Sequence, residues 1–170
     1  MKKWAGQEGI NDARVGYLNN YALVLMVLHY LQAGLEQPLL PNLHKVCPEM
    51  FTKQNNPRSL QYDDDSILEL VKQSENQNSL AELLIGFMLY FAKFNWSKEW
   101  ISIVAGKRQS REDSLDPTCE RFFMYIEDPF EEKNVARCVL KTSDFQRIFG
   151  AFKSACDKLI HNPCLSVLDV

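Results

Sequence analysis

Two short stretches of the chain carry polar residues at positions suited to holding a nucleotide. The first is Leu-Asn-Asn-Tyr at residues 18–21, where Asn19 or Asn20 would cap the start of an apolar helix. The free N–H groups and positive dipole at a helix start can bind phosphate, and Tyr21 beside them would stack on a base. Lys2, on a preceding helix, would add positive charge. The alternative is an ordinary helix cap with Tyr21 half-buried.

The second stretch is Tyr-Ile-Glu-Asp-Pro-Phe-Glu at residues 125–131, where an expected strand ends in acidic residues. Pro129 restricts the backbone before it and favours an extended Asp128. The carboxylates of Asp128 and Glu131 could accept hydrogen bonds from a base amine or hold a water molecule. The alternative is a strand end that is anchored by a buried Phe130.

Other residues with chemical potential indicate structural roles. The three aspartates at residues 63–65 are of the type that hard cations bind, but no second carboxylate cluster accompanies them, and a solvated loop that caps the following helix is the favoured explanation. The histidines and cysteines are too widely spaced to indicate a catalytic set, a zinc site or a disulfide framework. They are His29, His44, His161, Cys47, Cys119, Cys138, Cys156 and Cys164. The residue types alone therefore show no complete catalytic apparatus.

The elements that must position these residues are mainly helical. Helices are expected over residues 1–7, 20–32, 79–93 and 143–160, with helical turns at 43–51 and 66–74. Ser79 with Glu82, and Ser143 with Gln146, form capping boxes. Two strands, at 100–105 and 121–126, are expected to flank a charged loop at 107–117. The capped helices should bury Leu80, Leu83, Leu84, Phe87, Met88 and Phe91, and Phe145, Ile148, Phe149, Phe152, Cys156 and Leu159.

The composition predicts one globular domain of the α+β class, mainly α with a small β element. Of 170 residues, 46% are hydrophobic and 24% are charged. A formal net charge of −3 argues against a generic polyanion binder. No apolar run is long enough to span a bilayer, and no signal peptide is expected. The separated thiols favour a reduced, intracellular protein.

Several segments, in order, resemble one family. The strongest are Ile-Glu-Asp-Pro-Phe-Glu at residues 126–131 and Asn-Val-Ala-Arg at 134–137. The others are Lys-Lys-Trp-Ala at 2–5, Gly-Ile-Asn-Asp at 9–12, Leu-Asn-Asn-Tyr-Ala-Leu-Val-Leu-Met-Val at 18–27, Leu-Pro-Asn-Leu at 40–43, Glu-Leu-Leu-Ile-Gly-Phe at 82–87, Phe-Asn-Trp at 94–96 and Ile-Ser-Ile at 101–103. They resemble the PAP-associated (central) region of cytoplasmic poly(A) polymerases and terminal uridylyltransferases. The chain looks most like the germline-type poly(A) polymerases, including its tail at 165–170.

The resemblance implies that residues 1–170 are the helical central domain of a DNA polymerase beta-like nucleotidyltransferase. In this family an upstream nucleotidyltransferase domain carries a Gly-Ser motif and three metal-binding aspartates, and the active site is the cleft between the two domains. Neither the Gly-Ser helix nor a strand-borne aspartate pair occurs in this chain. The chain is therefore expected to be a fragment that is inactive alone. Its catalytic domain, in cis or in trans, would hold Mg²⁺ or Mn²⁺.

The implied activity is template-independent transfer of AMP from ATP to an RNA 3′ end. By resemblance, Tyr21 stacks on the incoming base, Asn20 and Lys2 contact the triphosphate, and Asp128 and Glu131 recognise the base. The family also implies cytoplasmic residence, an RNA-binding adaptor protein and no membrane partner. Basic residues such as Lys107, Arg108 and Arg111 could contact RNA, but the net-acidic composition favours the alternative, in which they lie in a solvated loop.

The chain departs from the family pattern at the phosphate contacts. Asn20 stands where serine is usual, and Gly6 stands where the family has a second lysine, so one positive charge is lost. In uridylyltransferases a histidine usually precedes the residue matching Asn134; here residues 132–133 are Glu-Lys, one residue shorter. Because adenine presents an amine where uracil presents a carbonyl, a carboxylate-lined pocket without that histidine favours ATP. The alternatives are a terminal uridylyltransferase and an inactive scaffold for adaptor proteins.

Overall fold

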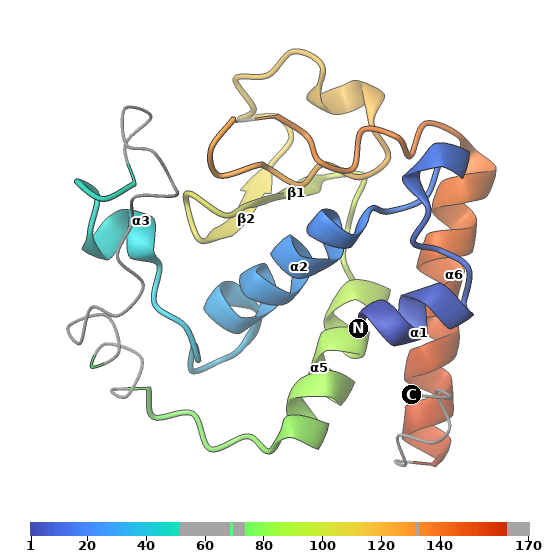
Figure 1. The fold of residues 1–170 in the computed structure, drawn as a ribbon, viewed down its shortest axis with the longest axis horizontal. Coiled ribbons are helices and arrows are strands. Elements are labelled where there is room, and N and C mark those ends of the chain that lie inside the picture. Colours follow the sequence, from blue (N-terminus) through green and yellow to red (C-terminus); the bar gives the residue numbers. More distant parts are fainter. Residues whose placement is uncertain (52–68, 70–73, 132, 163–170) are drawn as a thin grey trace.

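Helices dominate the computed structural model, which describes residues 1–51, 69, 74–131 and 133–162 (Figure 1). The main elements are α1 (Lys2–Gln7), α2 (Asn20–His29), α3 (Leu43–Val46), α5 (Leu80–Ala92), α6 (Thr142–His161) and the strands β1 (Glu99–Ser102) and β2 (Lys107–Ser110). A π-helical turn, Tyr30–Gly34, continues α2, and short 3-10 turns lie at Ala13–Val15 and Cys119–Arg121. The predicted mainly helical class with a small β element is confirmed. The predicted helix at 66–74 and the aspartates at 63–65 fall largely or wholly outside the described residues.

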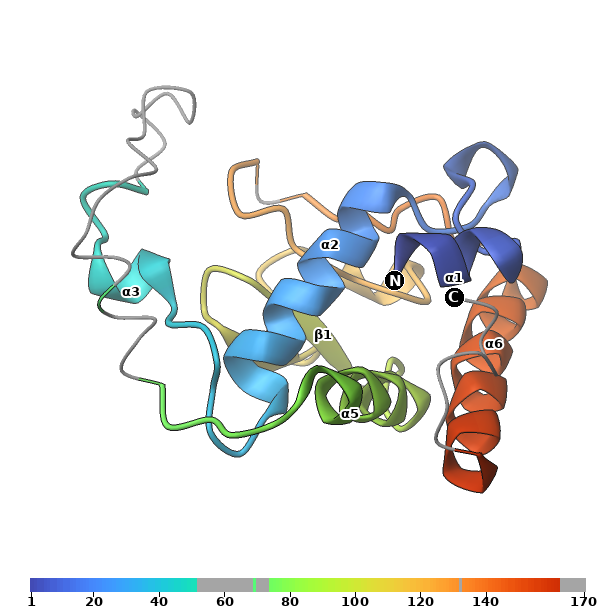
Figure 2. The same ribbon diagram turned by 60° about the horizontal axis from the view of Figure 1, so that its bottom comes forward.

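Helix α2 is apolar on nearly every side and is correspondingly central. Its side chains Leu23, Leu25 and Met26 are buried. In Figures 1 and 2 it runs between the β1–β2 hairpin and helix α5. The side chain of Asn19 caps its start by accepting a hydrogen bond from the Ala22 N–H at 2.6 Å. This cap fixes where the first turn of α2, with Asn20 and Tyr21, meets solvent.

Helices α5 and α6 pack against each other to close the core. Phe87 and Phe91 of α5 meet Phe152 of α6, with ring centroids 6.0 and 5.7 Å apart. The expected core position of Leu80 is wrong, since this side chain is 80% exposed in the first turn of α5. Residues later in α5, including Phe87, Met88 and Phe91, are buried in the core instead.

The two predicted capping boxes have different outcomes. The box of α5 is present: the Glu82 N–H donates to Ser79 Oγ at 3.3 Å, and Glu82 Oε2 accepts from the Ser79 N–H at 2.7 Å. The box of α6 is absent. That helix begins at Thr142, with Lys141 at the cap position, so Ser143 lies inside its first turn and donates to Asp144 instead.

The sheet differs from the prediction in its second strand. β1 pairs antiparallel with β2, with Glu99 opposite Ser110, so the expected charged loop at 107–117 begins as a strand. The chain turns back at Gly106, whose φ of 58° is favourable for glycine. Residues 121–126 make a single parallel bridge from Ile126 to Ile101 and no full strand. The residues of β2 are polar, and two of the four are exposed, so their pattern does not predict a strand. The strand forms because the turn at Gly106 brings these residues alongside β1.

Within the described residues, no helix is both long and apolar enough to cross a membrane. The four described cysteines are free thiols. Two of the three histidines have hydrogen-bond partners within the fold: His29 shares a hydrogen bond with the Tyr90 hydroxyl on α5, and His161 with the Asp157 carbonyl one turn earlier in α6. Each of these pairs is consistent with a structural role.

Candidate nucleotide-binding site

Tyr21 lies against the acidic residues that the sequence also singled out. It projects from the first turn of α2 and is 40% exposed. Burial raises the pKa of its hydroxyl, and so do the negative charge of Asp128, a hydrogen bond to that carboxylate and the more distant charge of Glu131. The fold therefore brings together three of the predicted site residues from two distant segments of the chain.

The acidic residues belong to a loop that we call the recognition loop and that is described at residues 128–131 and 133. The Asp128 N–H donates to the Lys133 carbonyl at 2.8 Å, and this bond closes the loop. Asp128 Oδ1 accepts from the N–H groups of Phe130 and Glu131 at 2.8 and 3.2 Å. Glu131 pairs with Lys133 at 3.0 Å in an exposed contact. Exposed ion pairs are weak, so a ligand can replace Lys133 as the partner of Glu131.

The base of the recognition loop is pinned by Asn134, which the sequence interpretation did not assign a structural role. Its carboxamide is buried, donates to the Met124 carbonyl at 2.9 Å and accepts from the N–H groups of Ile126 and Ala136 at 3.1 and 2.9 Å. Glu127 and Asn134 form an antiparallel bridge across the base. A lone asparagine followed by Val-Ala is the only sequence signal for this role.

Glu127 links the loop to the hairpin. Its Oε2 accepts from the Ser102 hydroxyl at 2.5 Å and from the Val104 N–H at 3.4 Å. The Ser102 hydroxyl in turn accepts from the Ala105 N–H at 2.9 Å. Although Glu127 is next to Asp128 in the sequence, its side chain therefore binds the β1–β2 hairpin and stabilises the start of the loop.

The ring of Tyr21 also borders an apolar cavity of about 270 Å³. Phe130 of the recognition loop and Val24 of α2 line the same cavity. Val24 also lines a smaller hollow of about 160 Å³, next to Lys2 of helix α1. Lys2 and Tyr21 therefore flank one exposed strip of α2.

Asn20 is the second predicted phosphate contact, and Gly6 is the position where the resemblance expects a lysine. Asn20 is exposed in the first turn of α2 and is not the cap, a role that Asn19 fills. Gly6 is exposed on α1, one turn after Lys2, so both positions share a face of the helix. A Cβ at Gly6 would lie 3.9 Å from Asn11 Nδ2, which is ordinary van der Waals contact. A larger side chain fits at this position.

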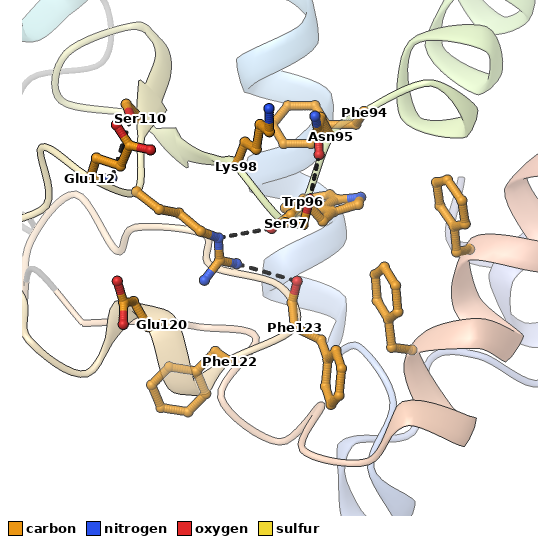
Figure 3. A pocket seen from close by; sticks show the side chains of 13 residues that line it. Phe94, Asn95, Trp96, Ser97, Lys98, Ser110, Glu112, Glu120, Phe122 and Phe123 are labelled. Carbon is orange, nitrogen blue, oxygen red and sulfur yellow. Dashed lines mark hydrogen bonds between the residues drawn. The ribbon is translucent and has the colours of Figure 1, made fainter.

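A larger hollow of about 810 Å³ contains none of the predicted site residues (Figure 3). Its wall includes Arg111, which is 8% exposed. The guanidinium donates to the carbonyls of Trp96 at 2.8 Å and of Phe123 at 3.3 Å, and also to that of Cys119. The expected solvated position for Arg111 is wrong, because its guanidinium forms these hydrogen bonds in the protein interior.

The other two basic residues considered for RNA lie on β2. Arg108 pairs with Glu99 at 3.3 Å and lies over the Tyr90 ring, 5.2 Å from its centroid. Lys107 is exposed. The three basic side chains therefore do not form one patch.

A metal ion has no evident place among these groups. In the described ranges no three histidine, cysteine, aspartate or glutamate side chains lie close enough together to hold one. Asp128 uses one oxygen within its own loop, and Glu131 pairs with Lys133. Within the described residues, these carboxylates therefore do not form a cation site.

Comparison with known proteins gives the family. Residues 79–134 match the sequence model of the Cid1 family poly A polymerases. Over 156 residues, the chain is 41% identical to poly(A) RNA polymerase GLD2-A of Xenopus laevis, an alignment that covers 91% of this chain and 30% of the relative. The chain thus spans about a third of the length of the curated relatives it matches.

Solved structures give the same result. A GLD-2/RNP-8 complex aligns with a TM-score of 0.71 and 32% identity, covering 99% of this chain and 51% of the other. A cytoplasmic RNA terminal U-transferase aligns with a TM-score of 0.75 and 30% identity, covering 99% of this chain and 53% of the other. The segment matched by the family model contains the β1–β2 hairpin and the recognition loop as far as Asn134. The chain carries the PAP-associated region of the Cid1 family poly A polymerases at residues 79–134 and is similar to GLD2 poly(A) polymerases over most of its length.

Proposed function

We propose that this chain is the nucleotide-recognition part of an enzyme that adds AMP from ATP to RNA 3′ ends. One observation carries the proposal: the exposed ring of Tyr21 lies beside the carboxylate of Asp128, with Glu131 near, in the PAP-associated region of a poly A polymerase relative. An aromatic face for stacking next to hydrogen-bond acceptors is what binding of an adenine requires.

In the proposed reaction the RNA 3′-hydroxyl attacks the α-phosphate of ATP and pyrophosphate leaves. A nucleotidyltransferase domain, in cis or in trans, would hold Mg²⁺ or Mn²⁺ and stabilise the transferring charge. Tyr21 stacks on the base, while Asn20 and Lys2 hold the triphosphate beside the first turn of α2. The residues of this chain orient ATP, and without that second domain the chain is inactive.

Recognition of adenine rests on the acidic side chains of the recognition loop. The adenine amine is a donor, and Asp128 and Glu131 offer acceptors, while the corresponding uracil carbonyl would face like partial charge. Residues 132–133, Glu-Lys, supply no histidine. We therefore infer a preference for ATP over UTP, although a solved relative is named as a U-transferase.

A scaffold function is the second candidate, and Gly6 favours it. The lysine that the family has at this position would hold the phosphates, and its loss weakens nucleotide binding. One solved relative is a complex of GLD-2 with RNP-8. An RNA-binding adaptor protein is accordingly a proposed partner under either function, and the cytoplasm is the proposed location, to be checked by fractionation.

Primer extension tests the proposal. The full polypeptide containing this segment is given a labelled RNA, Mg²⁺ and one nucleotide at a time. We expect extension with ATP in preference to UTP. Tyr21→Ala should raise the KM for ATP roughly ten- to a hundredfold, as expected for the loss of base stacking. Tyr21→Phe keeps the ring and serves as the matched control. A folded full polypeptide that extends with no nucleotide would support the scaffold function.

A further inference from the structure

The side chain of Asn19 makes two different bonds in opposite directions. Its Oδ1 accepts from the Ala22 N–H at 2.6 Å and so caps helix α2. Its Nδ2 donates to the Val135 carbonyl at 3.0 Å, which lies 116 residues away in the sequence. Capping uses only the oxygen, so the second bond has no part in starting the helix.

Val135 belongs to the support of the recognition loop. It is buried, and its N–H donates to the Ile126 carbonyl at 2.9 Å. It directly follows Asn134, whose carboxamide closes the base of the loop. At the other end of the link, Tyr21 stands two residues after Asn19. One half-buried carboxamide therefore joins the helix turn that bears the aromatic ring to the loop that bears the carboxylates.

We propose that Asn19 is a positioning residue that sets the spacing between Tyr21 and the recognition loop. The inference rests on the proposed function, because that spacing is the width of the proposed base-binding site. A carboxamide can cap and donate at once, because its acceptor is the oxygen and its donor is the nitrogen, two separate atoms. A serine or an aspartate at this position would cap α2 equally well but could not hold both contacts.

The test compares two substitutions in the full polypeptide. Asn19→Ser keeps the cap and removes the link, whereas Asn19→Ala removes both. Both should raise the KM for ATP roughly three- to tenfold, as expected for the loss of one hydrogen bond, with kcat changed by less than about twofold. Asn19→Ala should lower the melting temperature more than Asn19→Ser does, because it removes the cap of α2 as well as the link. Ser79→Ala, which removes the cap of α5 away from the site, should lower the melting temperature and leave the KM unchanged.

Hydrogen exchange gives a readout that needs no activity. Without the link, amides of residues 127–135 should exchange faster in Asn19→Ser, while those of residues 80–92 should not change. Unchanged exchange together with an unchanged KM would overturn the role of Asn19. If the unmodified polypeptide fails to extend RNA with ATP, the proposed function fails, and faster exchange in Asn19→Ser would still establish the link between helix and loop.

Discussion

The Ser102 hydroxyl and the Glu127 carboxylate lie 2.5 Å apart, and this hydrogen bond joins β1 to the residue immediately before the recognition loop. Ser102 is almost completely buried. The backbones are joined there too, because the Glu127 N–H donates to the Ile101 carbonyl at 2.9 Å. The hairpin is thus the platform on which Asp128 is held against Tyr21.

This contact predicts energetic coupling between two side chains outside the proposed base site. Glu127→Ala and Ser102→Ala should each destabilise the fold and raise the KM for ATP. Their effects should be non-additive by about 1.5 kcal/mol or more, because a hydrogen bond to a charged group is shared by both. Chemical denaturation of both single variants and the double variant measures the coupling. Ser97→Ala is the matched control at an exposed serine, and strict additivity would contradict the prediction.

Gly6 can be tested by restoring the lysine that the family has at this position. Gly6→Lys should lower the KM for ATP severalfold, because the added charge lies one turn from Lys2 on the same face of α1. Gly6→Ala separates the effect of charge from the effect on helix stability. It also replaces a glycine that destabilises the helix by about 0.5–1 kcal/mol, but it adds no charge. Both variants should be more stable to heat, and only the lysine should improve ATP binding. An equal KM for ATP in Gly6→Lys and Gly6→Ala would show that the triphosphate does not bind near this face of α1.

The stability of the domain should depend on pH through His29. Burial lowers the pKa of this imidazole to about 4, with a further contribution from the positive charge of Arg108. In the unfolded chain its pKa is about 6.5, so between these values the unfolded state binds the additional proton. Stability is therefore fully present above about pH 6.5 and is lost as the pH falls towards 4.

The size of this effect can be measured by urea unfolding. Between about pH 7.5 and pH 5, His29 should account for a loss of about 2 kcal/mol. His29→Gln removes the titrating group and leaves an amide that can meet the Tyr90 hydroxyl, the partner of His29 Nε2 at 2.8 Å. The variant should show a smaller loss over the same range. Parallel pH profiles for the two proteins would contradict the assignment to His29.

Arg111 should be a stability residue despite its basic character. Its guanidinium bonds three carbonyls, and a shorter or neutral side chain leaves these buried acceptors unpaired. Arg111→Ala should cost about 3 kcal/mol in the free energy of unfolding. The exposed Arg121 provides the control, since Arg121→Ala should change stability by less than about 0.5 kcal/mol. If Arg111→Ala weakened RNA binding and left stability intact, the residue would be a nucleic-acid contact.

Local patterns in the sequence predicted the helices well, and their ends where a side chain caps them. Ser79 and Glu82 form the predicted box because both partners are neighbours in the chain. Ser143 carries the same pattern without the cap, since the preceding backbone lets α6 begin at Thr142. A pattern states what a side chain can do, and tertiary packing decides whether the helix begins there.

The arrangement of the site was less accessible from the sequence. The residue types alone indicate Tyr21 and the Asp128–Glu131 pair as two separate stretches, and only the family resemblance places them at one base, because their meeting depends on contacts between distant segments. Asn19 shows the difficulty, because its cap is a local signal whereas its bond to Val135 is not. The burial of Arg111 also depends on carbonyls of separate loops, which no side-chain pattern reveals.

The closed base of the recognition loop separates the fold from its specificity. Asn134 and the bridge to Glu127 complete the hydrogen bonding of the core before the loop leaves it, so the tip between them carries little of the stability. Residues can be exchanged, inserted or removed at such a tip without disturbing the core. Under the proposed function, a change of nucleotide preference requires only a few substitutions in one surface loop, and the same scaffold can evolve, or be engineered, to use a different nucleotide.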